Sequence, residues 1–363
     1  MSMIYYITNM FPGKHDNYGI FCKKTFDFFN NSKEFTITRM SAIRGKSFHK
    51  FWNIFRYCKL LFSIAFTLLF KNNTFDIVYI QYVWKHAFFV TYFIKKLNRK
   101  KKIMFLNFHG EDLTDYDSLS SKEKEQFRQL CMFASGIVVP SIYFQNLLCS
   151  TLSLDLTKKI IVTPSGGVDS GLFFKQNNGI NNKIVYCSRF DKDKGWDDFI
   201  LAAKELVSVN NSLHFLMIGY GKETSEVQKM IQELKLNNKI EVIINPTQGK
   251  IAESYSDASL FVFPTRRLSE SLGLVALEAM SCGLPVIASN IGAISEYVRE
   301  NENGFLYQPG NVKELIEKMM LFFSKDSNIQ LCMQKKAYET AENYRDKKVK
   351  VDFINQIIKF SNK

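Results

Sequence analysis

The hydrophobic pattern of the chain alternates short apolar runs with longer segments of helical spacing. Short apolar runs are typical of buried strands, and apolar residues that recur every three or four positions are typical of helices. The predicted strands are Ile4–Thr8, Asp76–Gln81, Ile103–Phe108, Gly136–Pro140, Lys183–Ser188, Leu213–Ile218, Lys239–Ile244, Leu260–Phe263, Val286–Ser289 and Gly304–Tyr307. The predicted helices include Phe21–Asn30, Trp84–Leu97 and Leu272–Ser281, with further helices after Asn311. This alternation predicts an α/β fold with parallel sheets.

The length of 363 residues predicts two domains, each large enough to bury its own core. The glycines of Pro164-Ser165-Gly166-Gly167 and the polar run 176–182 mark a break between them. We therefore expect a first α/β domain over 1–168, a linker over 169–182 and a second α/β domain over 183–344. The segment 345–360 after them is amphipathic.

The cysteines and the first residues of the chain indicate the cellular compartment in which the protein is expected. The seven cysteines are scattered, odd in number and without a C-x-x-C pair, which argues against a disulfide framework or a zinc ribbon and fits a reducing cytoplasm. The first residues, MSMIYYITN, lack a basic region before the apolar run, so they predict a first strand rather than a signal peptide.

The net charge of +13 is concentrated in the first half of the chain. Residues 1–182 contain 24 basic against 12 acidic residues, whereas the remainder contains 24 against 23. A basic domain beside a nearly neutral one indicates an anionic partner for that domain, such as a membrane surface, a lipid phosphate or an acidic glycan. Nucleic acid is not expected as the partner, because the chain has no recognisable nucleic-acid-binding motif.

Residues 47–71, SFHKFWNIFRYCKLLFSIAFTLLFK, are aromatic and basic at one end and uncharged and mostly apolar from Leu60 to Phe70. The apolar run is about half the length that spans a bilayer, so a transmembrane helix is not expected. Two interpretations remain open: a core helix packed on the sheet, and a helix that also touches a membrane. In the second, aromatic side chains lie at the interface and basic ones lie near lipid phosphates. Those aromatic residues are Phe51, Trp52 and Phe55, and the basic ones are Lys50, Arg56 and Lys59.

The segment 258–292 carries the clearest chemistry. A buried strand ends at Pro264, a polar loop with Glu270 follows, and a helix then carries Glu278. In a βαβ unit this loop opens at the carboxyl ends of the strands, where ligands bind. The amides of Leu272 to Leu274 at the helix start favour an anion, and carboxylates accept hydrogen bonds from hydroxyls. A nucleotide-sugar satisfies both requirements.

The same segment, PTRRLSESLGLVALEAMSCGLPVIAS with its E-x7-E spacing, resembles glycosyltransferase family 4, the glycosyl transferases of group 1. The departure is Ser271-Leu272, where the family more often has Gly-Phe. The resemblance implies the GT-B architecture: two Rossmann-like, doubly wound domains that face each other across a cleft with the active site. It also implies retaining transfer of a sugar, and that the segment 345–360 crosses back to pack on the first domain.

Other motifs of that family can be placed along the chain. His109-Gly110-Glu111-Asp112 resembles its H-G-x-D motif, whose histidine contacts the donor sugar. The loop RFDKDKG with Arg189 and Lys194 resembles the loop that neutralises the donor diphosphate, and Gly219 begins a G-x-G step near the nucleotide. Gly19 lies in the first loop, which covers the donor phosphates in the family, although a glycine that simply starts a helix would look the same.

The resemblance thus implies a set of site residues. Those with catalytic roles are His109, Glu270, Arg189 and Lys194, and those that bind the donor are Gly19, Gly219, Leu272, Gly273, Leu274 and Glu278. Arg189 and Lys194 would clamp the diphosphate, because fixed cations stabilise the charge that develops on a leaving phosphate. Glu270 would hold the sugar hydroxyls and Glu278 the ribose hydroxyls. No nucleophile is assigned.

No metal and no cofactor are expected, since the nucleotide-sugar is a substrate. Asp115-Tyr116-Asp117 and Asp191-Lys192-Asp193 spell D-x-D, the metal motif of the other large glycosyltransferase fold, but paired aspartates on loops are common. Gly219-Tyr220-Gly221 lacks the third glycine and the acidic partner of a dinucleotide site.

The predicted function is transfer of a sugar from a UDP- or GDP-sugar to a hydroxyl of a glycan or a lipid-linked saccharide, in assembly of a cell-surface polysaccharide or glycolipid. The protein is expected in the cytoplasm, peripherally on the inner face of the membrane. Two alternatives stay open: a hydrolysing nucleotide-sugar epimerase of the same fold, and a binding partner with an inactive site. The intact Arg189, Lys194, Glu270 and Glu278 argue against an inactive site.

Overall fold

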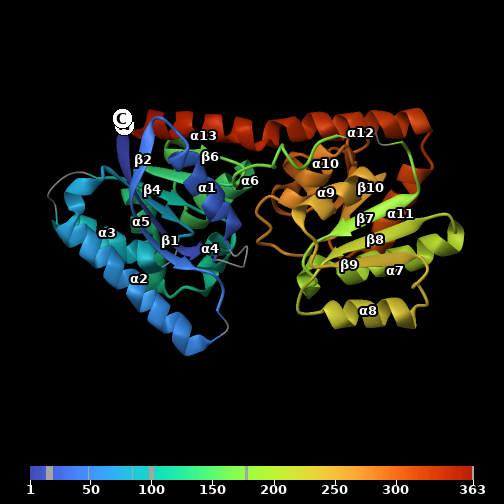
Figure 1. Cartoon of the computed structure of the whole chain (residues 1–363), viewed down its shortest axis with the longest axis horizontal. Coiled ribbons are helices and arrows are strands. Elements are labelled where there is room, and N and C mark those ends of the chain that lie inside the picture. The colour runs from blue at the N-terminus through green and yellow to red at the C-terminus, as the bar shows by residue number, and fades with distance from the viewer. Residues whose placement is uncertain (14–18, 48, 84, 98–101, 176–178, 362–363) are drawn as a thin grey trace. The chain divides into compact units, whose positions relative to one another are not determined.

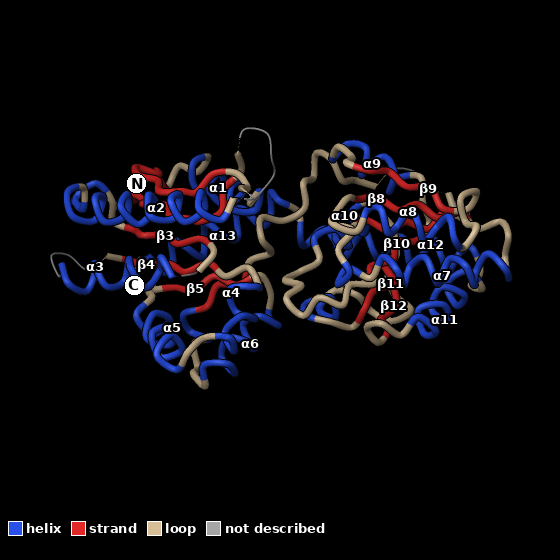
Figure 2. The backbone as a smooth tube through the Cα atoms, turned by 90° about the horizontal axis from the view of Figure 1, so that it is seen from below, coloured by secondary structure: helices blue, strands red, loops and turns tan. Residues whose placement is uncertain are grey.

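The structure is a computed structural model that describes residues 1–13, 19–47, 49–83, 85–97, 102–175 and 179–361. The chain divides into two compact units, Met1–Gly166 with Val349–Lys363, and Gly167–Lys348. Each unit is a parallel sheet between helices (Figures 1 and 2). The α/β class predicted from the sequence is confirmed.

The first unit contains a six-stranded parallel sheet of order β2-β1-β3-β4-β5-β6. Its strands are β1 Ser2–Phe11, β2 Phe35–Arg44, β3 Ile77–Gln81, β4 Ile103–Asn107, β5 Gly136–Val139 and β6 Ile160–Val162. Its helices are α1 Ile20–Asn30, α2 Lys50–Phe70, α3 Lys85–Leu97, α4 Glu111–Thr114, α5 Ser121–Phe133 and α6 Ile142–Leu152, with the short 3-10 turns η1 Asn72–Thr74, η2 Asp115–Ser118 and η3 Thr157–Lys159.

Alternation along the strands of this sheet builds two apolar layers. On β1, Tyr5 and Ile7 face one layer, which α2, α3, α5 and α6 cover, whereas Ile4 and Tyr6 face the other. The second layer is closed by α1 and by α13 (Asp346–Ser361), whose Phe353 contacts the rings of Phe29 and Tyr79. Because helices cover both sides of the sheet, the central parallel strands are buried on both faces. Each of them is therefore a continuous apolar run in the sequence.

Two strands of the first unit, β2 and β6, have no counterpart among the sequence predictions, and both are edge strands. β2 forms one edge of the sheet and pairs with β1 alone, and of its residues only Phe35 and Ser41 are buried. An edge strand is covered on fewer sides, so Phe35–Arg44 lacks the apolar run by which the central strands were predicted.

The first unit also contains a fully buried histidine, His86. His86 on α3 is 0% exposed, and among the described residues neither ring nitrogen has a hydrogen-bond partner. Burial lowers the pKa of His86 to about 3. The unfolded chain therefore binds a proton more readily than the folded one, and stability falls as pH drops below about 6.5.

We expect the His86→Phe variant to lose this pH dependence. Between pH 7.5 and pH 5.0, the wild-type free energy of unfolding should fall by about 2 kcal/mol more than that of the variant. Urea titrations at the two pH values, followed by circular dichroism, measure the difference. The exposed His214 provides a control, His214→Gln, which should keep the wild-type behaviour. Equal pH dependence in wild type and His86→Phe would contradict the prediction.

The second unit contains a six-stranded parallel sheet of order β12-β11-β10-β7-β8-β9. Its strands are β7 Lys183–Cys187, β8 His214–Gly219, β9 Ile240–Ile244, β10 Leu260–Phe263, β11 Val286–Ser289 and β12 Gly304–Tyr307. Its helices are α7 Trp196–Val209, α8 Thr224–Glu233, α9 Gln248–Ser256, α10 Leu274–Ser281, α11 Val312–Phe323 and α12 Ser327–Ala341, with η4 Lys192–Lys194, η5 Gly292–Glu296 and η6 Glu342–Tyr344. One apolar layer lies under α9, α10 and α12, and the other under α7, α8 and α11.

The unit boundary and the predicted linker differ in detail. The division falls between Gly166 and Gly167, close to the predicted domain end at 168. Residues 169–175, however, do not form a free linker, because Phe173 is fully buried in the second unit's core and its ring lies 6.0 Å from that of Tyr255. Of the polar run 176–182, residues 176–178 lie outside the described part of the chain.

Candidate donor site

The strand order of the second unit reverses between β7 and β10. The chain runs outward from β7 to β8 and β9, and then returns to β10 on the opposite side of β7. Ligands of doubly wound sheets bind at the carboxyl ends of the strands at such a switch point. The loops that follow β7 and β10 contain Arg189, Lys194 and Glu270, so the topology places all three at one edge of the sheet.

Gly195 allows the two loops to touch. It has a left-handed backbone with φ of 67°, and a Cβ built at this position would lie 1.9 Å from the carbonyl oxygen of Pro264. A side chain cannot occupy that space, and left-handed backbone is costly for residues other than glycine. Lys194 is therefore held directly beside the loop that follows β10. Gly195 was not among the predicted site residues, although it closes the quoted RFDKDKG motif.

Lys194 and Glu270 form the central ion pair of this edge. The Nζ atom of Lys194 lies 2.5 Å from Oε2 of Glu270, and the two side chains are 9% and 13% exposed. The hydroxyl of Thr265 donates a hydrogen bond of 3.3 Å to the same carboxylate oxygen. The ammonium also lies 6.0 Å from the centre of the Phe263 ring. A cation and a carboxylate predicted to hold different parts of one donor thus lie side by side.

Arg189 is placed differently. Its side chain is 52% exposed and its Nη1 atom lies 3.2 Å from Oδ2 of Asp191. The neighbouring Asp193 accepts a hydrogen bond of 2.6 Å from Nε of Arg267. Both carboxylates of the Asp191-x-Asp193 motif therefore face guanidinium groups. Among the described residues there is no group of three or more acidic, histidine or cysteine side chains arranged to hold a metal ion.

A second charged network fixes the base of the same loops. The Nη2 atom of Arg266 donates to the carboxylate of Asp197 over 2.8 Å and to that of Asp198 over 2.5 Å. Its Nε atom donates to Asp198 over 3.0 Å. Its backbone amide donates to the carbonyl of Asp193 over 2.8 Å. These contacts join the β10 loop to the first turn of α7. Sequence reasoning did not single out Arg266, and the paired arginines of P-T-R-R were the signal that could have done so.

Helix α10 starts two residues later than predicted. Gly273 is left-handed, with φ of 66°, and stands before the first helical residue, Leu274. Leu272 is buried, and its carbonyl accepts a hydrogen bond of 2.9 Å from the hydroxyl of Tyr297. The amides that open the helix without an intrahelical acceptor are those of Leu274 and Val275. No side chain caps them, so an anion-attracting helix end remains at the switch point.

Glu278 and Gly219 occupy the predicted elements. Glu278 is partly buried within α10, and its carboxylate contributes, after burial, to raising the pKa of the Cys187 thiol to about 12. It therefore lies near the end of β7. Gly219 ends β8, and a Cβ there would lie 1.9 Å from the carbonyl oxygen of Ser188. This glycine lets the loop after β8 approach the loop of Arg189.

In the first unit, His109 stands at the carboxyl end of β4 in a polar chain. Its Nε2 lies 2.7 Å from the amide nitrogen of Gln81, which can only donate, so Nε2 accepts and the proton of the neutral ring is on Nδ1. The amide oxygen of Gln81 accepts from Asn107, which also donates to the hydroxyl of Tyr79. Burial lowers the pKa of His109 to about 3, which favours this neutral ring.

The backbone around His109 is held by Asp112. The Oδ1 atom of Asp112 accepts from the amides of His109 and Gly110, each over 2.9 Å, and Oδ2 accepts from Val83 over 3.2 Å. Nearby Tyr82 has a left-handed φ of 60°, an uncommon conformation for a residue with a side chain. Its ring lies 6.4 Å from the imidazole of His109 and nearly parallel to it. Tyr82 was not predicted as a site residue.

The predicted first-loop glycine, Gly19, is described, but residues 14–18 of its loop lie outside the described part of the chain. Gly19 has φ of 76° at the start of α1, and a Cβ there would lie 2.8 Å from backbone atoms of Met10. Close packing is thus sufficient to require glycine. Its role in phosphate binding stays a prediction.

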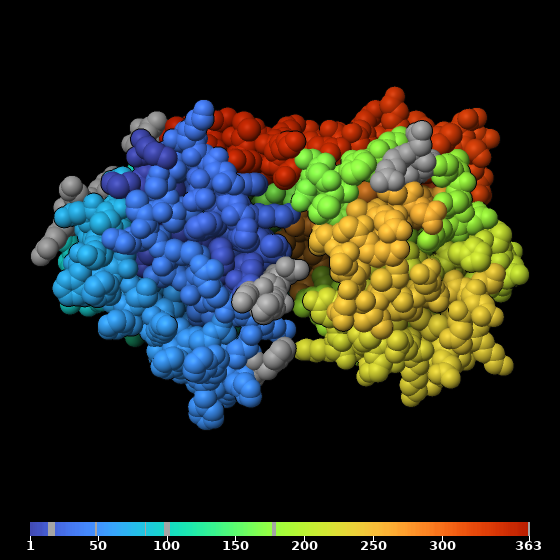
Figure 3. Space-filling model, viewed as in Figure 1, coloured from blue at the N-terminus to red at the C-terminus, as the bar shows by residue number. Residues whose placement is uncertain are grey.

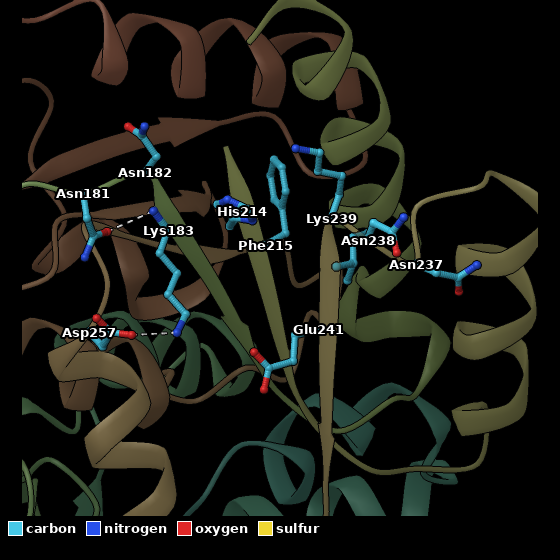
Figure 4. A pocket seen from close by; sticks show the side chains of 11 residues that line it. Asn181, Asn182, Lys183, His214, Phe215, Asn237, Asn238, Lys239, Glu241 and Asp257 are labelled. Atoms are coloured by element: carbon cyan, nitrogen blue, oxygen red, sulfur yellow. Dashed lines mark hydrogen bonds and ion pairs between the residues drawn. The ribbon is translucent and has the colours of Figure 1, made fainter. Parts of the chain in front are cut away.

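One well-formed cavity of this unit is not at the switch point. It has a volume of about 540 Å³ and lies at the amino ends of β7, β8 and β9, the opposite edge of the sheet (Figure 4). Lys183 pairs with Asp257 there over 2.9 Å. The carboxyl ends of the strands carry the charged residues described above, so we place the candidate site there rather than in this cavity.

Comparison with known proteins identifies a family that part of the chain matches. Residues 172–343 match the family model of the glycosyl transferases group 1. The chain resembles the group 1 glycosyl transferases. It is 26% identical over 293 residues to N-acetyl-alpha-D-glucosaminyl L-malate synthase of Bacillus anthracis, covering 77% of this chain and 73% of that one. It is 27% identical over 246 residues to the capsular polysaccharide biosynthesis glycosyltransferase CapM of Staphylococcus aureus, covering 63% of this chain and 61% of that one.

Solved structures share the fold over nearly the whole chain. Anabaena Alr3699/HepE in complex with UDP aligns with a TM-score of 0.76 at 15% identity, over 99% of this chain and 100% of that one. Sucrose-phosphate synthase from Thermosynechococcus elongatus aligns with a TM-score of 0.73 at 17% identity, over 99% and 98%. The predicted GT-B fold is confirmed by these neighbours and by the two six-stranded parallel sheets.

Proposed function

We propose that this protein is a retaining glycosyltransferase. It moves a sugar from a nucleotide-sugar, a UDP- or GDP-sugar, to a hydroxyl of a glycan or of a lipid-linked saccharide. The observation that carries this proposal is the Lys194–Glu270 pair beside the uncapped start of α10 at the switch point of the second unit. A cation, a carboxylate and free helix amides together suit a ligand with a diphosphate and several hydroxyls.

The proposed reaction uses these groups as follows. The bond between the anomeric carbon and the donor diphosphate breaks, and charge grows on the leaving phosphate. Lys194, Arg189 and the amides of Leu274 and Val275 stabilise that charge. Glu270 and Glu278 accept hydrogen bonds from hydroxyls of the sugar and of the ribose. The acceptor hydroxyl attacks the same face of the sugar, and its proton passes to the leaving phosphate, so no protein nucleophile is needed.

Metal independence is part of the proposal. The diphosphate charge would be balanced by Arg189 and Lys194, and the motif that could bind a divalent cation, Asp191-x-Asp193, is already paired with guanidinium groups.

The neutral His109 would donate a hydrogen bond from Nδ1 to the donor sugar, while Gln81 donates to its other ring nitrogen, Nε2.

For the biological setting we propose assembly of a cell-surface polysaccharide or glycolipid. The similarity to CapM, whose name places it in capsular polysaccharide biosynthesis, supports this. The basic first unit would face an anionic membrane that carries the acceptor, with the protein in the cytoplasm. A hydrolysing epimerase is the alternative within the fold, and it would consume the donor without any acceptor.

Saturation-transfer NMR against UDP-, GDP-, ADP- and CMP-sugars tests the donor proposal. We expect one nucleotide class to bind, and we expect Arg189→Ala to weaken that binding about ten- to a hundredfold, because a charge-assisted phosphate contact is lost. Lys192→Ala, an exposed lysine in the same loop, is the matched control and should bind as wild type. A folded wild-type protein that binds none of the four classes would overturn the transferase proposal and favour an inactive binding partner.

A further inference from the structure

Helix α2 of the first unit has an apolar surface on both sides. Leu60, Ile64 and Leu68 are buried against the sheet, together with Thr67. The opposite side carries six large apolar residues that are exposed, and we call them the aromatic face. They are Phe51, Ile54, Phe55, Phe62, Phe66 and Leu69. The helix lies on the outside of its unit (Figures 1 and 3).

The aromatic face is a continuous stripe. Its residues recur at intervals of three, four and seven, the spacing that places side chains on one side of a helix. Phe51 is 88% exposed, Phe62 74% and Phe66 47%, and Cys58, which is also exposed, lies between them. Single exposed apolar residues are ordinary, but a long stripe of them marks a surface that meets an apolar partner.

The part of the sequence that contains α2 is strongly basic. Residues 35–110 contain 14 lysines and arginines, and Asp76 is the one acidic residue. Lys50 begins α2, Lys59 lies within it and Lys71 follows its last residue. All three are exposed, and within the described part of the chain they make no ion pair. Arg56 does not belong to this set, because its guanidinium donates to the carbonyl oxygens of Arg44 and Gly45. The sequence prediction that Arg56 contacts lipid phosphates is not supported by this position.

We infer that α2 is the membrane-docking element of this protein, and that its aromatic face inserts into one leaflet of an anionic bilayer while Lys50, Lys59 and Lys71 contact the lipid headgroups. Apolar insertion combined with cationic contacts is the recognised basis of interfacial helix binding. Trp52 at the border of the face suits the interface, where indole rings are favoured. This inference rests on the membrane partner proposed above, but not on the transfer reaction.

A spanning helix does not fit. α2 has 21 residues and is long and apolar enough to cross a bilayer by length and composition, so the length argument made from residues 60–70 does not decide the matter. The buried side of α2 excludes a membrane-spanning orientation. Leu60, Ile64 and Leu68 belong to the core of the first unit, and withdrawing the helix would expose that core to water.

A second copy of the chain does not fit either. Two aromatic faces brought together would also bring together the lysines of both helices. No acidic residue between positions 35 and 75 is present to offset their repulsion. An anionic lipid surface supplies the missing negative charge.

Vesicle flotation tests the inference on the full chain. Wild type should bind vesicles of phosphatidylglycerol and phosphatidylcholine, and bind pure phosphatidylcholine much less. Phe55→Ser combined with Phe62→Ser should weaken binding to the anionic vesicles about tenfold or more. The matched control is Val209→Ser combined with Val351→Ser, two exposed apolar positions away from α2, and it should bind as wild type.

A fluorescent label on Cys58 reports the depth of the face. The double variant Cys149→Ser/Cys332→Ser leaves Cys58 as the one cysteine of the chain that is not buried, so a polarity-sensitive dye attaches there. Its emission should shift to shorter wavelength on anionic vesicles. A label on Cys332, in a Cys58→Ser/Cys149→Ser background, should not shift.

Three results would overturn the inference: no binding to anionic vesicles, equal binding by the Phe55→Ser/Phe62→Ser variant, or a dimer in sedimentation velocity that the same substitutions abolish. These results are separate from the donor test. Vesicle binding is measured without a nucleotide-sugar, and donor binding by NMR is measured without lipid, so either proposal can fail alone.

Discussion

Replacing Lys194 by alanine is expected to lower the rate at which the bound donor releases its nucleoside diphosphate by about 100- to 1,000-fold. The Nζ atom of Lys194 sits 2.5 Å from the Glu270 carboxylate in a position that is only 9% exposed, where water screens charge poorly. A fixed cation there acts on the leaving phosphate as the bond breaks, so the loss should appear in kcat more than in donor affinity.

The measurement is release of the nucleoside diphosphate from the donor class identified by NMR, with wild type and variant at saturating donor. Lys192→Ala is the control, since Lys192 lies two residues away on the same loop and is exposed. Because Glu270 also loses its partner, Lys194→Gln provides a second variant that keeps a hydrogen bond but not the charge. A folded Lys194→Gln protein with the wild-type rate would contradict the assignment.

Replacing Gly195 by alanine is expected to destabilise the second unit by about 3 kcal/mol or more. The added Cβ would lie 1.9 Å from the carbonyl oxygen of Pro264, and the backbone φ of 67° is unfavourable for alanine. Relief of that clash requires the loops after β7 and β10 to separate. We therefore expect donor binding to be lost together with stability.

A matched glycine gives the opposite sign. Gly249 in α9 is exposed, has no atom within 4 Å of a built Cβ, and lacks a left-handed backbone, so Gly249→Ala should be neutral or stabilise by about 0.5–1 kcal/mol. Urea unfolding followed by Trp196 fluorescence, in a Trp52→Phe/Trp84→Phe background, reports on the second unit alone. Equal midpoints for Gly195→Ala and Gly249→Ala would show that the close approach at Gly195 is not needed.

The central strands of both sheets could be predicted from the sequence because each is buried on two faces. β3, β4, β7, β8 and β10 read as apolar runs followed by polar or turn residues. β2 and the three-residue β6 escaped prediction because they are edge strands, and the start of α10 was predicted two residues early. The first residue of α10 is set by the left-handed backbone of Gly273, and this conformation cannot be predicted from the spacing of apolar residues.

The residue types of the candidate site were also readable from the sequence, but their pairing was not. Lys194 and Glu270 are 76 positions apart, and Asp193 and Arg267 are 74 apart. The sequence by itself determined that the chain is an α/β protein, that its charge lies in the first half, and which loops resemble those of glycosyltransferases. Apolar runs, charge and loop motifs are local along the chain, so no tertiary contact is needed to recognise them.

Only the tertiary structure decided which charges meet, which side of α2 is covered, and that His86 is buried without a hydrogen-bond partner among the described residues. The physical reason is the same in each case. Parallel strands bring distant loops to one edge of a sheet, and a helix face is buried or exposed according to what packs on it, which no local sequence pattern contains.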